Sequence, residues 1–99
     1  MIIWGYIFHT PGANPATDRF VLERNGVKTT LVAVADHDTA ADVARGLVED
    51  GAKVIELCGA FGFAGAAKVK AAVGDRAAVN FVTLTADSAH QTAVGFGVA

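Results

Sequence analysis

Side chains able to do chemistry gather in residues 53–62 (KVIELCGAFG). An apolar run that is typical of a buried strand carries one carboxylate, Glu56, and ends at the only cysteine, Cys58. Because side chains alternate across a strand, Glu56 and Cys58 should share one face. A carboxylate among apolar residues suits general acid/base catalysis. A thiol where a strand gives way to a helix suits nucleophilic catalysis. We therefore predict a site at the carboxyl end of this strand.

Each of these residues also has a structural explanation. Glu56 could face water from an edge strand, or pair with Lys53 or Arg76. Cys58 could be packed as a small apolar residue, as free cysteines often are. We expect Glu56 to be the main catalytic group, with His9, at the end of the first strand, assisting it and Cys58.

The turn after Cys58 is rich in glycine, and its N–H groups could hold a carboxylate or stabilise developing negative charge. Its spacing matches neither the dinucleotide-binding fingerprint nor the phosphate-binding loop. Glycines required simply to form the turn explain it equally well. The ligand-binding residues predicted here are Gly59, Ala60, Phe61 and Gly62.

Polar residues also follow the other predicted strands, where parallel sheets bind their ligands. Thr10, Asp36 and Thr83 are therefore predicted to contact a ligand, although Asp36 could instead cap a helix. The histidines are too scattered to form a metal-binding motif, so no metal site is predicted.

The elements that must position these residues follow from periodicity and turn signals. Asn14-Pro15 and Asn25-Gly26 are interpreted as the start and stop of a helix. We predict a single α/β domain over residues 1–99, βαβαβαβ, with a small, mostly parallel four-stranded sheet. The predicted strands are 2–8, 27–35, 54–57 and 77–84. The predicted helices are about 15–24, one that follows residues 36–38 and stops at Gly51, and about 63–73.

Two strand orders fit this pattern. A sequential order would place every helix on one face and leave the other face bare, whereas a flavodoxin-like order would cover both faces. The sequence leaves this choice open. Beyond residue 84, Asp87 or Ser88 could cap a short helix, but residues 95–97 (GFG) break any regular pattern. Residues 85–99 are expected to be either a loose tail or a tail that a neighbouring subunit orders.

Composition narrows the choice of partners. Hydrophobic residues make up 53% of a chain of 99 residues, more than so small a core can bury, so a homodimer or higher homo-oligomer is expected. The formal net charge is −2 and the basic residues are dispersed, which argues against nucleic acid. A single cysteine, no signal-peptide pattern and no apolar run long enough for a membrane span predict a cytoplasmic protein without a membrane partner.

Residues 55–62 (IELCGAFG) resemble the signature IELCGGFG of a family of short bacterial proteins catalogued as a domain of unknown function. The resemblance covers residues 2 to about 84 and includes the helix that ends at residues 48–51 (VEDG). Ala60 replaces a glycine, and residues 83–87 stand where the family has a histidine-rich segment. The resemblance implies an α/β fold and no established activity.

These observations predict a small cofactor-independent enzyme that acts on a small organic molecule. The expected chemistry is proton transfer of the isomerase, lyase or cyclase type. The alternative is a non-catalytic module that binds a small ligand or another protein. The Glu56→Gln variant separates the two hypotheses. Loss of turnover with the fold intact would support the enzyme, and full activity would contradict it.

Overall fold

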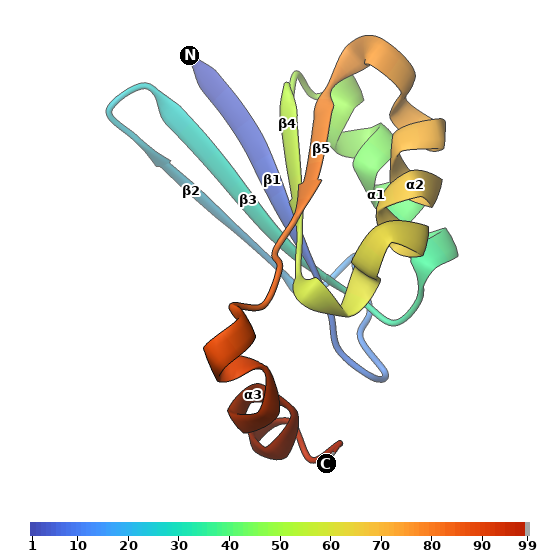
Figure 1. Cartoon of the computed structure of the whole chain (residues 1–99). Helices are drawn as coiled ribbons and strands as arrows, with labels where there is room; N and C mark the ends of the chain where they lie inside the picture. Colours follow the sequence, from blue (N-terminus) through green and yellow to red (C-terminus); the bar gives the residue numbers. More distant parts are fainter. Residues whose placement is uncertain (99) are drawn as a thin grey trace.

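A computed structural model describes residues 1–98 and shows a five-stranded mixed sheet with strand order β2-β3-β1-β4-β5 (Figure 1). Only β2 and β3 are antiparallel; the other neighbouring strands are parallel. None of the helices within these residues is long and apolar enough to cross a membrane. The elements are β1 (Ile2–His9), β2 (Arg19–Arg24), β3 (Val27–Val34), α1 (His37–Glu49), β4 (Val54–Leu57), α2 (Gly62–Val73), β5 (Ala78–Phe81) and α3 (Ala89–Gly95).

The predicted four-stranded, mostly parallel βαβαβαβ sheet is therefore wrong. Residues 15–24, predicted to be a helix, contain strand β2, which forms a hairpin with β3. Asn25 and Gly26 both have positive φ, 52° and 80°. Two such residues form the turn whose twist matches a two-residue β-hairpin. Asn-Gly is thus the hairpin turn and not the end of a helix.

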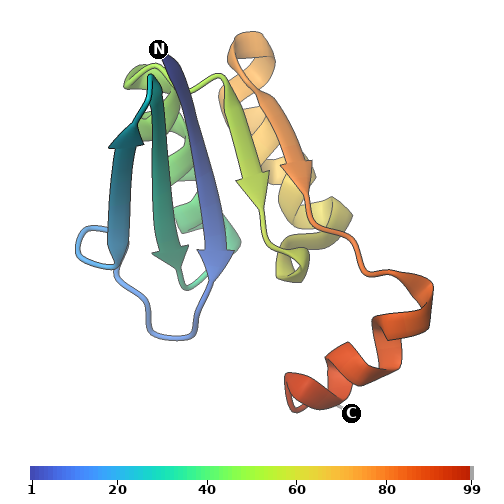
Figure 2. The ribbon, with the colours of Figure 1, turned by 90° about the vertical axis from the view of Figure 1, so that its left-hand side faces the viewer.

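Both crossover helices cover the same face of the sheet. The connection from β3 through α1 to β4 and the one from β4 through α2 to β5 move across the sheet in the same direction. Right-handed crossovers in one direction place their helices on one side. Figure 2 shows the strands in front with α1 and α2 behind them. Within residues 1–98, no helix covers the other face of the sheet.

The core fills the space between the sheet and these two helices. On β1, Ile7 is fully buried, and Gly5 lies directly under Leu47 of α1. Alanines on α1 let the helix approach the sheet closely. The other main core side chains are Val32, Val34, Ala40, Ala44, Ile55, Leu57, Val69 and Val73.

The open face takes the alternate residues of the same strands. Trp4, Tyr6 and Phe8 of β1 point away from α1 and are half-buried. Phe20 and Leu31, which are paired across β2 and β3, are exposed on this face. Apolar surface thus lines both sides of the sheet, but helices cover only one.

A β-carbon added at Gly5 would lie 2.6 Å from Cδ1 of Leu47, so Gly5→Ala forces apart a packed contact. We expect it to lower the free energy of unfolding by about 1–3 kcal/mol. Gly46→Ala is the matched control, because a β-carbon there meets no atom within 4 Å. In a helix interior it should stabilise by about 0.5–1 kcal/mol. Urea unfolding measures both, and effects of the same sign would contradict this packing.

Asp36 caps α1 by accepting a hydrogen bond from the N–H of Thr39 at 2.7 Å. This hydrogen bond lowers the pKa of the Asp36 carboxyl. Because the folded pKa lies below the unfolded one, the stabilisation is present above about pH 4 and is lost as the pH falls further. Asp36→Asn keeps an acceptor without the charge. Urea unfolding between pH 7 and pH 3 should show a smaller loss of stability in this variant than in the wild type, and identical pH profiles would contradict the cap.

Candidate functional site

One row of side chains runs across all five strands on the open face. Strand pairing places Phe20, Leu31, Tyr6, Glu56 and Asn80 in register, one from each neighbouring strand. The side chains of Tyr6 and Glu56 are half-buried, whereas Asn80 is exposed. A hydroxyl, a carboxylate and an amide therefore lie in register on a largely apolar face, which also carries Thr29 and Arg24.

The position of Glu56 follows from its neighbours in β4. Ile55 and Leu57 are completely buried against the helices, so alternation turns Glu56 to the open face. Within residues 1–98 Glu56 forms no ion pair, and Arg76, considered as a partner, donates instead to the carbonyls of Ala72 and Val73. Glu56 is thus a half-buried carboxylate that remains available to a ligand.

Tyr6 shares its surroundings with Glu56 and Cys58. Partial burial raises the pKa of the Tyr6 hydroxyl, and negative charge on Cys58 and then on Glu56 raises it further. Strand pairing places Glu56 beside Tyr6, and Cys58 follows Glu56 by two residues along the chain. A raised pKa keeps the Tyr6 hydroxyl protonated at neutral pH, where it can donate a hydrogen bond.

His9 lies close to Cys58 through its backbone only. The N–H of His9 donates to Sγ of Cys58 at 3.3 Å, whereas the imidazole Nε2 lies 2.8 Å from the carbonyl oxygen of Ala35. Alternation along β1 places His9 with Ile7, on the helix side, and Tyr6 on the open face. The neighbour of Glu56 in register on β1 is therefore Tyr6, and His9 lies beyond it on the other face.

The glycine-rich turn is largely occupied by its own contacts. Residues Gly59–Phe61 form a 3₁₀ turn in which the N–H of Phe61 donates to Cys58 and that of Gly62 donates to Gly59. The Phe61 ring is buried in the core and stacks on His37, with ring centroids 5.1 Å apart. Only Gly59 and Ala60 of this turn are exposed, so Phe61 does not form a wall of a site on the open face.

The three polar residues predicted at other strand ends do not form one cluster. Asp36 caps α1, which is the alternative that the sequence left open for it. Thr83 lies beyond β5, in an exposed segment that leads to α3. Thr10, which follows β1, lines a hollow on the open face.

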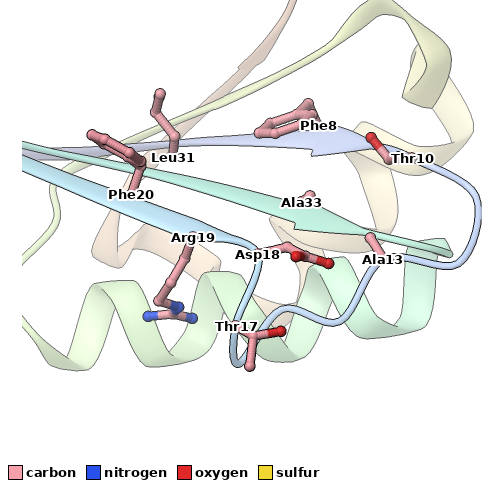
Figure 3. Close-up of a pocket in the computed structure, with 9 residues that line it drawn as sticks. All are labelled: Phe8, Thr10, Ala13, Thr17, Asp18, Arg19, Phe20, Leu31 and Ala33. Atoms are coloured by element: carbon pink, nitrogen blue, oxygen red, sulfur yellow. The ribbon is translucent and has the colours of Figure 1, made fainter.

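This hollow, of about 560 Å³, lies between the end of β1, the following loop and the β2–β3 hairpin. Phe8, Phe20 and Leu31 line it from the side opposite α1, and Arg19 points toward the α1 side (Figure 3). Phe20 and Leu31 also belong to the row that contains Glu56, so the hollow opens onto that row. Sequence reasoning missed it because residues 15–24 were predicted to be a helix.

Tyr6 and Asn80 were also missed as site residues. Their only signal in the sequence is a polar group inside a strand, and their register with Glu56 depends on pairing between segments far apart in the chain. Among residues 1–98, no group of three or more His, Cys, Asp or Glu side chains is placed to hold a metal ion.

Tyr6 is the only tyrosine in the chain, so tyrosinate absorbance at 295 nm reports its ionisation alone. We expect a midpoint above the ordinary value near pH 10. Cys58→Ser and, to a smaller extent, Glu56→Gln should lower it, because each removes negative charge near the phenolate. Glu49→Gln, the same charge loss on the outer side of α1, is the control. A midpoint that moves in neither site variant would contradict the shared environment.

Comparison with known proteins places this geometry in a family. No curated protein matches the chain. A family model does match, over residues 2–97, which include the strands of the sheet, all three helices and the row that contains Glu56. The expectation that the chain belongs to a family of unknown function is thereby confirmed. The chain therefore belongs to the family of unknown function DUF6506.

Proposed function

We propose that the open face binds a small organic molecule and that Glu56 catalyses proton transfer on it, as in isomerases, lyases or cyclases. The observation that carries the proposal is the in-register row of Tyr6, Glu56 and Asn80, which runs from the central strand β1 to the edge strand β5 on the open, largely apolar face. Polar groups so placed give a bound molecule one orientation, while the surrounding side chains supply contact area.

The hollow beside the row suits the apolar part of the ligand. Phe8, Phe20 and Leu31 provide aromatic and aliphatic surface. A molecule seated on these side chains would extend its polar end along the row, past Tyr6, to Glu56. The substrate class that fits is a small, partly apolar carbonyl compound, such as a cyclic ketone, a lactone or an aryl 2-oxo acid.

Each polar side chain then has a distinct role. The Glu56 carboxylate takes a proton from the carbon next to the carbonyl and returns it to the same or a neighbouring carbon. The Tyr6 hydroxyl donates a hydrogen bond to the enolate oxygen that forms in between. Asn80 binds a second polar group of the substrate, and Cys58 borders the site. This chemistry moves only protons and requires no cofactor.

Exchange in deuterated water tests the proposal even while the natural substrate is unidentified. Compounds of these three classes that show saturation transfer from the protein by NMR are incubated with it in D₂O. The wild type should introduce deuterium next to the carbonyl, and Glu56→Gln should slow this by about 10²–10⁴-fold because the base is lost. Tyr6→Phe should slow it less, since it removes one donor.

Glu49→Gln is the matched control and should exchange at the wild-type rate. Binding must persist in Glu56→Gln, as saturation transfer will show. Exchange at the wild-type rate in Glu56→Gln would refute the catalytic role of this carboxylate. Ligands that bind the wild type without any exchange would instead favour the alternative, a non-catalytic ligand-binding module.

A further inference from the structure

The C-terminal arm, residues 82–98, stands away from the rest of the molecule (Figures 1 and 2). Its last backbone hydrogen bond to the sheet runs from the N–H of Val82 to the carbonyl of Leu57 at 2.9 Å. From Thr83 to Val98, the hydrogen bonds of the arm are local, such as that from Thr92 Oγ1 to the carbonyl of Ser88. None of the residues of α3 is buried.

The composition of the arm is not that of a free tail. Val82, Leu84, Val94, Phe96 and Val98 are all at least half exposed. A helix of seven residues is too short to be stable alone in water, where isolated helices need about 12–15 residues. The arm therefore needs a surface on which to bury these side chains.

The open face of the sheet also exposes apolar side chains that a partner could bury. Ile2, Phe20 and Leu22 on it are more than half exposed, and Trp4 and Phe8 add aromatic area. The five strands are spaced about 4.8 Å apart and average roughly 20 Å in length, so they span about 500 Å² in plan. The protruding side chains and the surface of the arm add to this area. The total approaches the roughly 800 Å² that each partner buries in a stable complex.

The path of the chain directs the arm away from its own sheet. Residues 82–85 (VTLT) contain no glycine or proline that would reverse the chain, and Thr85 is extended, with φ −78° and ψ 143°. Both views place α3 beyond the carboxyl ends of the parallel strands. A formal net charge of only −2 offers little repulsion between two copies.

We propose that two copies of this chain form a symmetric dimer in which the arm of each crosses the open sheet face of the other. The contact is self-complementary, because each copy supplies one arm and one face. Glu56 and Tyr6 lie in the middle of the face, so the partner's arm would close the candidate site from above. The dimer does not depend on the proton-transfer reaction proposed for that site.

Two matched pairs of variants of the full chain test the contact. Leu22 and Val21 are neighbours in β2 with exposed fractions of 53% and 50%, but they point to opposite faces. On the arm, Phe96→Asp and Gln91→Asp add the same charge, and only the first removes an exposed aromatic ring. Light scattering after size exclusion, or sedimentation equilibrium, gives the dimer dissociation constant of each variant.

The wild type should be a dimer at micromolar concentration. Leu22→Asp and Phe96→Asp should each raise the dissociation constant by about 30-fold or more, because each puts a charge in place of a large apolar side chain that the dimer would bury. Val21→Asp and Gln91→Asp should change it by less than about fivefold. Circular dichroism confirms that each variant remains folded.

Mixing the two disruptive variants tests whether the arm is exchanged. In a mixed dimer, the intact arm of Leu22→Asp meets the intact face of Phe96→Asp, so one of the two contacts is restored. The mixture should therefore form more dimer than either variant alone. If the arm of each copy were folded on its own sheet, mixing the two variants would produce no such gain in dimer.

Three results would overturn the proposal. The first is a wild type that stays monomeric at 100 µM, and the second is a Leu22→Asp variant as dimeric as Val21→Asp. The third is a mixture that gains no dimer. Loss of dimer in Leu22→Asp but not in Phe96→Asp would show that the face pairs without the arm, which contradicts the exchange.

Discussion

The direction of the two crossovers is the constraint on which the rest of the structure depends. From β3 to β4 and from β4 to β5, the chain moves across the sheet in the same sense. A right-handed connection then has to place α1 and α2 on one side. The hydrophobic core forms on that side, and the opposite face has no cover of its own. One topological choice thus determines which side chains become core and which remain accessible.

The alternation of side chains along each strand determines which polar groups lie together on the open face. Because side chains alternate along β4, the burial of Ile55 and Leu57 under the helices turns Glu56 to the open face. A carboxylate on this face avoids the cost of complete desolvation. The same alternation on β1 turns Gly5 toward Leu47, where only a hydrogen atom fits without displacing the leucine. It turns Tyr6 to the open face, in register with Glu56. Packing on one face and polar grouping on the other are therefore two results of the same register.

The open face carries both the candidate site and the apolar surface that needs a partner. A monomer would leave aromatic side chains of β1 and β2 in water, close to a carboxylate suited to a ligand. Covering this face would bury apolar area and at the same time exclude water from the surroundings of Glu56. Ligand binding and self-association would then use the same surface. A change in the affinity of one should therefore change the affinity of the other.

The sequence by itself determined the elements that local signals specify. These are the first strand, the helix beginning at Asp36, the strand that carries Glu56 and Cys58 on one face, and the helix that ends at Gly74. Residues 19–24 were misassigned to a helix because Asn25-Gly26 was interpreted as a helix stop. An Asn-Gly pair between two short apolar runs is a strong local signal of a hairpin turn, and this signal was missed.

Only the tertiary structure decided the partners of Glu56. That Tyr6 and Asn80 lie beside it, and that His9 does not, depends on strand register between segments some 25 to 50 residues apart in the chain. The hollow between β1 and the hairpin has the same origin. Alternation assigns a residue to a face from sequence alone, but register is fixed by hydrogen bonds between strands that are distant in sequence.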